Sequence, residues 1–396
     1  MQTSRSTLVV SIVVIVLLLT ACAGGPVGGA DTESLAGSEV DAEEDARAGA
    51  ELSPTVSEVF VEIAAMDLDP DARHAYLHER AIEEGEVLFY SSMNIATNEA
   101  WATGFGEAYP EVDQRYVGLG RPADLLERVR AEARAGRHLV DVVQGAAVGT
   151  LLQDEGLVTP HHGVPVPDRF PDEYVEDYGI MLTLTPQVIA WNTDLVPDES
   201  APRDIDDFLE PEHAGCVFSG GPSWVAAMIA DRGYEATEQW FQDFVANDGV
   251  VEVASTSGNT RSLAAGEFAC MVYSHTHTLE PMIVDDGAPL EWHAPDPTPA
   301  AAQRIYVYEQ ARNPHAAALF IHWILSEQGA RILANDSRIP LHPDVETSYE
   351  RLEPFSTVGS DLQQRLRPLT TEESLEVDEQ ALDLIEAYAV PSPDSS

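Results

Sequence analysis

The chain has 396 residues, about twice the usual size of one domain, so two domains or two lobes are expected. Its 21 basic residues are all arginine and stand against 68 acidic residues, which gives a formal net charge of −47. The absence of lysine excludes a Walker A loop, a pyridoxal Schiff base and a Ser-x-x-Lys acyl-transfer site, because each needs an ε-amine. The acidic charge also disfavours nucleic acid as a partner, since a phosphate backbone would be repelled.

The N-terminus resembles the signal peptide of a bacterial lipoprotein. An apolar run at 8–19 follows Arg5 and is short for a membrane span. Small residues then precede Cys22, as in a lipobox, so residues 1–21 are expected to be a signal peptide and Cys22 to be lipidated. A cysteine in an uncleaved anchor helix is the alternative. The glycine-rich residues 23–29 disfavour it, because they cannot continue a helix.

Two segments with different composition follow. Residues 22–54 are rich in Ala, Gly, Glu and Asp and lack aromatic residues, which predicts a flexible acidic tether. Residues 55–84 form an N-terminal helical segment that Pro70 divides into two short helices. The apolar residues predicted to face the core are Val59, Ile63 and Met66 in the first helix and Ala72, Tyr76 and Ile82 in the second.

The main body alternates strands and helices, which predicts an α/β fold. Buried strands are expected at the short apolar runs 87–90, 141–145, 187–191, 216–218 and 269–273. Helices are expected around Trp101 and Phe105, over 122–135, and after Asn313, which would cap a helix with the apolar stripe Ala316, Leu319, Phe320, Trp323 and Ile324. Residues 351–396 are expected to be an acidic C-terminal helical extension, with Leu375, Leu382, Ile385 and Tyr388 on its packed face.

Loops of small and hydroxylic residues follow several of these strands. Ligands of open α/β sheets bind outside the carboxyl ends of the strands, where helix N-termini present free N–H groups. Any one loop could be only a helix cap or a turn, because Ser, Thr, Asn and Gly are favoured there in any case. Their recurrence points to a binding site, and the candidate ligand-binding residues are Ser91, Ser92, Asn94, Gly145, Trp191, Ser223, Trp224, Ser257, Asn259, Thr260, Tyr273 and His275.

Seven stretches of the body, taken in order behind the lipobox, carry a family resemblance. They are 84–92, 105–110, 133–143, 191–197, 209–215, 265–267 and 313–329. Together they resemble bacterial extracellular solute-binding proteins (family 1) of ABC importers, of the ferric and small-anion type. The resemblance implies a periplasmic-binding-protein-like fold of type II: two lobes, each a doubly wound α/β sheet, joined by crossover strands. In that fold a hinge closes the lobes around the ligand.

The same resemblance implies boundaries and a role. Lobe 1 would comprise 85–185 and 288–326, and lobe 2 would comprise 186–287 and 327–350. The protein would act outside the cytoplasm as a monomer, anchored by lipid to the outer face of the cytoplasmic membrane. It would capture a small solute, an organic anion or a zwitterion, and deliver it to an ABC transporter permease. No cofactor is expected.

A metal ligand is the alternative, and one departure from the family bears on it. Ferric members carry adjacent tyrosines just after the strand that ends here at Tyr273, whereas this chain has Thr276 and His277 near that place. Tyr273, His275 and His277 could form a substitute site, because His-x-His donates two nitrogens from one extended segment. The preferred interpretation is that these residues line a cleft for an organic ligand.

The sequence also bears on catalysis and on the state of the cysteines Cys216 and Cys270. Catalysis is not expected, because the sequence has no His-Glu-x-x-His, no Gly-x-Ser-x-Gly and no zinc-type cluster, and a structural envelope lipoprotein is the remaining rival. The family's strand order would place Cys216 and Cys270 on neighbouring strands of lobe 2. Outside the cytoplasm such a pair tends to oxidise, but neighbouring strands do not always bring sulfurs within reach, so a disulfide and two buried thiols are both retained.

Overall fold

The computed structural model describes residues 55–390 apart from 121, 147, 161–163, 168, 220, 253–254, 358–359 and 370. These residues belong to one compact unit. The predicted signal peptide, the lipidated Cys22 and the tether lie outside the described residues. Within the described part of the chain, no helix combines the length and the apolar character needed to cross a membrane.

Two β-sheets share one long strand, β5 (Gly179–Asn192). The first sheet has the order β2 (Asp113–Gly118), β1 (Glu86–Ser91), β3 (Val142–Gly145), β10 (Thr298–Tyr308) and β5. Strand β1 is parallel to β2 and β3, whereas β10 is antiparallel to β3 and β5. Short strands extend this sheet: β4 (Val158–Thr159) and β12 (Leu366–Pro368) on β10, and β11 (Ile339–Pro340) on β5.

The second sheet continues from the far end of β5. Its order is β5, β8 (Cys270–His275), β6 (Val217–Ser219) and β7 (Val250–Glu252), with β9 (Leu290–His293) also on β5. Pro186 of β5 pairs with Ala300 in the first sheet, and the next residue, Gln187, pairs with His275 in the second. Strand β5 is therefore a crossover strand, and all of its residues are buried.

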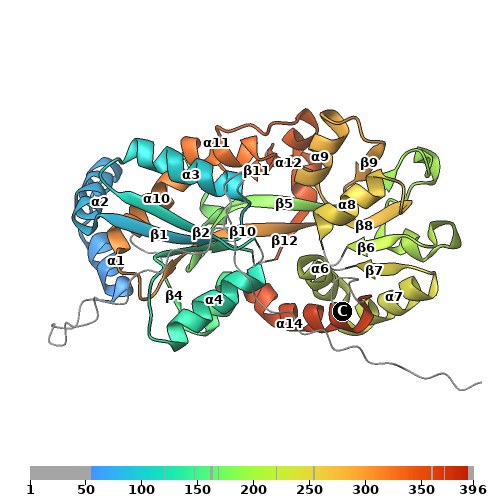
Figure 1. The fold of residues 1–396 in the computed structure, drawn as a ribbon, viewed down its shortest axis with the longest axis horizontal. Helices are drawn as coiled ribbons and strands as arrows, with labels where there is room; N and C mark the ends of the chain where they lie inside the picture. The colour runs from blue at the N-terminus through green and yellow to red at the C-terminus, as the bar shows by residue number, and fades with distance from the viewer. Residues whose placement is uncertain are drawn as a thin grey trace, which may run out of the picture. The chain divides into compact units, whose positions relative to one another are not determined.

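Helices cover both sheets (Figure 1). Those with the first sheet are α1 (Val56–Ala65), α2 (Pro70–Glu84), α3 (Ile95–Ala108), α4 (Pro122–Arg134), α5 (Val148–Asp154), α10 (Pro314–Leu325) and α11 (Glu327–Asn335). The others are α6 (Pro222–Arg232), α7 (Tyr234–Ala246), α8 (Thr256–Ala264), α9 (Thr276–Val284), α12 (Glu353–Ser356), α13 (Asp361–Arg365) and α14 (Thr371–Tyr388). Short 3-10 helices lie at Asp172–Tyr174, Asp198–Ser200, Ile205–Leu209, Pro211–His213 and Glu350–Leu352.

Helix α10 has the buried stripe that its spacing predicts, and Phe320 packs on Phe89 of β1 with ring centroids 4.8 Å apart. Its cap differs from the expectation. The side chain of Asn313 makes no cap hydrogen bond, and its Nδ2 donates to the buried Asp141 at 3.1 Å. The carboxylate of Glu84 instead accepts from the backbone N–H groups of His315 and Ala316 at 3.2 and 2.8 Å. An acidic side chain brought from α2 thus satisfies the helix N-terminus.

The expected buried faces are confirmed at Val59, Ile63 and Ile385 but differ elsewhere. Met66 and Ile82 are exposed, and α2 buries Leu77 and Ala81 instead. In α14, Leu382 is 47% exposed. Its core residues are Val377, Ala381, Leu384 and Ile385. Each error is a shift of one residue or a few around the helix, because spacing alone does not fix which stripe meets the neighbouring element.

The contacts of several segments also differ from the expected lobe boundaries. Helix α11, expected in lobe 2, packs on α3 and α10, and Trp101 Nε1 donates to Gly329 O at 3.3 Å. Strand β9, expected in lobe 1, pairs with the second-sheet part of β5. Strand β12 belongs to the expected helical extension but pairs with β10. These strands have four residues or fewer, too short to carry a periodic signal.

A disulfide joins Cys216 and Cys270, whose Cα atoms are 4.9 Å apart. Cys216 directly precedes β6 and Cys270 begins β8. The two strands are parallel neighbours, with Val217 opposite Met271. Adjacent strand starts therefore bring the two sulfur atoms together in the second sheet.

Candidate functional site

Residues of both sheets line one cavity of about 410 Å³. The first sheet contributes Thr185 of β5 and residues 300–304 of β10, with Ser92 just after β1. The second sheet contributes Tyr273 and His275 at the end of β8. A volume of several hundred Å³ is typical of small-molecule sites.

Five of the twelve predicted ligand-binding residues line this cavity: Ser92, Ser223, Ser257, Tyr273 and His275. His277, from the alternative metal set, also lines it. Ser223 and Ser257 lie in the first turns of α6 and α8, which follow β6 and β7. The expectation that loops at the carboxyl ends of strands meet at one place therefore holds for these residues.

The other hydroxyl and amide candidates are not among the residues that line the cavity, and each is hydrogen-bonded to another part of the protein. Ser91 is buried and donates to Gln144 Oε1 at 2.8 Å. Asn94 caps α3 by accepting from Thr97 N–H at 2.8 Å. Asn259 Nδ2 donates to Ser219 Oγ at 3.1 Å, and Thr260 Oγ1 donates to Thr256 O at 2.8 Å. Of these four, Asn94 is the helix cap that the alternative describes, and the other three side chains are bonded within the fold.

Gly145 and the two tryptophans are not cavity walls either. A Cβ on Gly145 would lie 3.1 Å from Leu125, so this glycine serves close packing. Trp191 is fully buried, and the guanidinium of Arg203 lies 4.6 Å from its ring centroid. Trp224 is 2% exposed and lies on a separate hollow that includes Ile205 and Asp204. Both indoles thus belong to the core of the second sheet rather than to the cavity.

A hydrogen-bond network organises one wall. Gln187 Nε2 donates to Ser223 Oγ at 2.5 Å and to Tyr273 OH at 3.3 Å. The Tyr273 hydroxyl lies 2.5 Å from His275 Nε2. Burial raises the pKa of Tyr273, so the phenol stays protonated, and its hydroxyl and the imidazole share this hydrogen bond. A Cβ on Gly221 would lie 2.7 Å from the tyrosine ring, so only glycine fits beside it.

Both cavity histidines are neutral. Burial, together with the charge of Arg338, lowers the pKa of His275 to about 3. The same two causes, with His275 itself as a further one, lower the pKa of His277 well below its ordinary value. These imidazoles therefore offer neutral donor and acceptor atoms to the cavity at physiological pH.

Three arginines that sequence analysis did not single out also line the cavity: Arg304, Arg338 and Arg367. Each is held by a carboxylate. Arg304 bonds Glu176 at 2.9 and 3.0 Å, Arg338 bonds Asp336 at 2.7 Å, and Arg367 bonds Glu373 at 3.1 Å. The sequence could have indicated Arg304 as a site residue, because it is the single charged residue in the strand 298–308. The sequence pattern did not distinguish Arg338 and Arg367, since they lie in polar loops or short strands.

One carboxylate lines the cavity as well, that of Asp378 on α14. Burial raises the pKa of Asp378 to about 6, although the charge of Arg304 opposes this shift. Among the described residues, the charged side chains that line the cavity are therefore three guanidinium groups and one carboxyl group of unusually high pKa. This arrangement favours an anionic group in the ligand.

The alternative metal residues do come together. The rings of Tyr273, His275 and His277 form a row with centroid separations of 4.9 and 5.0 Å. Neutral imidazoles can ligate a metal, but the charge of Arg338 and the protonated phenol both oppose a cation. Among the described residues, no group of three or more His, Cys, Asp or Glu is arranged to hold a metal ion.

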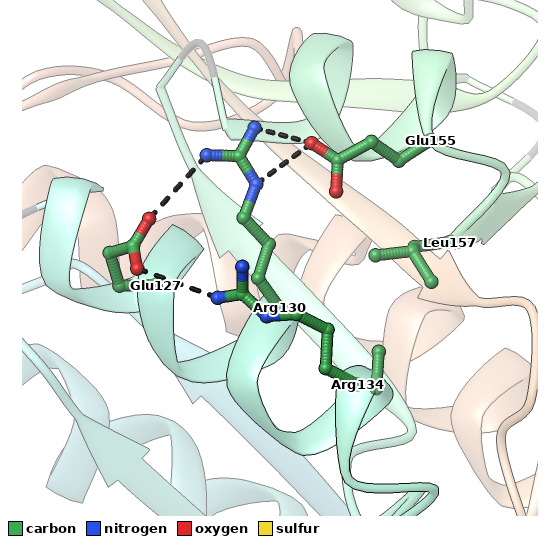
Figure 2. Close-up of a pocket in the computed structure, with 6 residues that line it drawn as sticks. Glu127, Arg130, Arg134, Glu155 and Leu157 are labelled. Atoms are coloured by element: carbon green, nitrogen blue, oxygen red, sulfur yellow. Dashed lines mark hydrogen bonds and ion pairs between the residues drawn. The ribbon is translucent and has the colours of Figure 1, made fainter.

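A second hollow, on the outside of α4, has charges that neutralise one another. Figure 2 shows Arg130 between Glu127 and Glu155, and Arg134 beside Glu127. Arg130 lies 3.6 Å from Glu127 and donates from Nε to Glu155 at 2.8 Å. Glu127 and Glu155 line this hollow beside the arginines, whereas Glu176, Asp336 and Glu373 are not among the described residues that line the cavity. The exposed carboxylates of the hollow therefore compete directly with any anionic ligand.

Comparisons with known proteins point to one family. A family model described as bacterial extracellular solute-binding protein matches residues 100–353. Iron-bound HitA from Pseudomonas aeruginosa is similar, with a TM-score of 0.64, 18% identity, and coverage of 77% of this chain and 99% of that one. The ferric binding protein from Campylobacter jejuni has a TM-score of 0.62 and 18% identity, covering 76% and 99%. At these identities the likeness is one of fold, and no curated protein matches the chain.

Proposed function

The chain belongs to the family of bacterial extracellular solute-binding proteins, and from this premise we propose that its cavity binds a small organic anion or zwitterion for delivery to an ABC importer permease. The predicted family and the predicted fold, two sheets joined by crossover strands, are both confirmed. The members of this family are binding proteins, so the proposal contains no reaction.

The observation that carries the proposal is the meeting of Arg304, Arg338 and Arg367 at one cavity. The whole chain carries −47, so its long-range field repels anions. An anion must then be held by groups at short range, and the guanidinium fork fits carboxylate, phosphonate and sulfonate oxygens. Three of the 21 arginines lining a single cavity supply that local positive charge.

Hydroxyl groups complete the polar lining. Ser92 follows β1, Ser223 and Ser257 lie in the first turns of α6 and α8, and Thr185 lies on β5. Such groups donate to oxygen atoms without adding charge. We expect the arginines to hold the anionic group and the hydroxyls to fix its orientation.

Thermal unfolding against a panel of small anions tests this function. A ligand that binds only the folded protein stabilises it by RT ln(1 + [L]/Kd), without turnover. Arg338→Gln should abolish the shift, because it removes a cavity guanidinium. Arg331→Gln is the matched control, since Arg331 is exposed on α11 and pairs with Glu327. Equal shifts in both variants would contradict the proposal.

A ferric ligand is the second candidate. Trichodesmium IdiA (FutA), solved in complex with iron and citrate, has a TM-score of 0.63 and 18% identity, covering 77% of this chain and 99% of that one. The row of Tyr273, His275 and His277 is the feature of this chain that favours such a ligand. Binding of Fe(III) that is lost in Tyr273→Phe and His277→Ala, but kept in Arg338→Gln, would replace the anion proposal.

The proposed anchor is the lipid on Cys22. The family acts outside the cell membrane, and one lipidated cysteine with the tether 22–54 would keep a monomer near its permease. Cys22→Ser should leave the protein unprocessed or released, as cell fractionation would record. Unchanged processing and membrane association in this variant would contradict the anchor.

A further inference from the structure

The cavity has a wall that lies beyond the family match. The family model ends at residue 353, yet Arg367, Leu369, Asp378 and Leu382 all line the cavity. They come from β12, the residue after it, and helix α14. The ligand that this chain takes up therefore meets residues from a segment outside the matched part of the family.

This C-terminal wall is fastened to both sheets. Strand β12 pairs with β10, and Arg304 Nη2 donates to Leu369 O at 3.0 Å. Helix α14 packs on α6, as Figure 1 shows, and it also contacts α5 and α7. Val377, Ala381 and Leu384 bury its other face in the core of the second sheet. The wall is thus built into the fold, and its residues hold fixed places at the cavity.

One atom of this wall lacks a partner. Within the described residues, Asp378 Oδ2 is buried and accepts no hydrogen bond. Two atoms of other cavity residues, Thr185 Oγ1 and His277 Nδ1, are also buried without a hydrogen-bond partner. A buried carboxylate oxygen without a donor is costly in free energy, and the cost is removed when a donor arrives.

The neighbouring arginine does not supply that donor. The guanidinium of Arg304 is engaged by Glu176 through two hydrogen bonds and by Leu369 O through a third. Burial raises the pKa of Asp378 to about 6, so the group is still ionised at neutral pH. An ionised carboxylate inside a cavity is best satisfied by a cationic donor such as an ammonium group.

We propose that Asp378 is a specificity-determining residue that binds the ammonium group of a zwitterionic solute, whose anionic group lies among the cavity arginines. This assignment rests on the proposed function and narrows it from anions in general to solutes with both charges. The C-terminal segment 366–388 then selects the ligand through Asp378 and also supplies Arg367, which holds the anionic end together with Arg304 and Arg338 of the matched part.

Matched pairs of probes that differ by one amino group test the assignment on the purified full-length protein. Suitable pairs are alanine and propionate, 4-aminobutyrate and butyrate, and taurine and ethanesulfonate, with affinities measured by calorimetry. In at least one pair the amino member should bind more tightly by about 10-fold or more, the range of one charge-assisted hydrogen bond. Asp378→Asn should remove this preference and leave the affinity of the partner without the amino group within about twofold.

Glu379→Gln is the matched control, because Glu379 is exposed on the same helix and loses the same charge. A loss of affinity by both members of the pair in Asp378→Asn would indicate a structural role and overturn the assignment, as would an unchanged preference. If Asp378→Asn does not fold, Asp378→Ser is judged by the same two outcomes.

The assignment and the proposed function fail in different ways. If the anions bind and no pair shows a preference for its amino member, only the assignment of Asp378 is wrong. If no member of any pair binds, the proposed function itself is contradicted.

Discussion

Arg304 and Glu176 are 128 residues apart in the chain and form a two-bond pair, with Arg304 Nε and Nη2 at 3.0 and 2.9 Å from the two carboxylate oxygens. The arginine side chain is only 4% exposed, so this is a buried cation held in a fixed direction. The register of β10 against β5 shifts at Gln303 and Arg304. Bulges of this kind redirect side chains near binding sites.

Glu176→Gln should destabilise the protein, because it leaves the buried guanidinium of Arg304 without its counter-charge. The free energy of unfolding should fall by about 3 kcal/mol, the usual cost of breaking a buried pair from one side. Urea denaturation measures it. Asp177→Asn, at an exposed neighbouring position, is the control, and an equal loss in both variants would contradict the role of the pair.

Ser257→Ala should weaken the binding of an organic anion by about 1 kcal/mol, since its hydroxyl lines the cavity. Thr260→Ala should change the affinity little, because Thr260 is bonded to Thr256 O and Ser274 Oγ inside the fold. Calorimetry on both variants measures the two effects. An equal loss of affinity in Thr260→Ala would mean that the cavity extends further than its lining residues indicate.

Asp378 should make the stability depend on pH. Its pKa is raised to about 6 in the folded protein, so its contribution to stability is complete below the ordinary value of 3.8 and is lost as the pH rises through 6. The free energy of unfolding of Asp378→Asn, relative to that of the wild type, should therefore rise by roughly 2 kcal/mol from pH 4 to pH 7.

The comparison with wild type isolates this effect from the other charged or titratable groups of the cavity: Arg304, Arg338, Arg367, His275 and His277. His275 acts in the opposite direction, because its pKa is lowered to about 3 and its contribution is lost as the pH falls below 6.5. Urea denaturation across this range gives both curves. Parallel curves for wild type and Asp378→Asn would show that the carboxyl titrates normally.

The disulfide between Cys216 and Cys270 should be present in protein exported from the cytoplasm. Thiol labelling of the unfolded, unreduced protein should detect neither cysteine. The bridge closes a sequence separation of 54, so reduction should lower the free energy of unfolding by about 4 kcal/mol on the chain-entropy estimate. Labelling of both residues without reductant would exclude the bridge.

The sequence by itself determined the features that depend on local pattern. Alternating apolar runs and helical spacing predicted the α/β body, and the stripe of α10 is buried as its period requires. Strand-end loops also follow from local pattern, so Ser92, Ser223 and Ser257 could be predicted to lie near one another and do line one cavity. These features need no knowledge of which distant segments meet.

Only the tertiary structure decided which side chains face the cavity. Trp191 lies on β5 and Arg304 on the neighbouring strand β10, yet the tryptophan is buried in the core and the arginine lines the cavity. Arg367 and Asp378 reach the same place from the C-terminal segment through the pairing of β12 and the packing of α14. The direction of a side chain depends on strand register, on a bulge and on the face that a helix buries. These follow from contacts between residues far apart in the chain, which local spacing does not record.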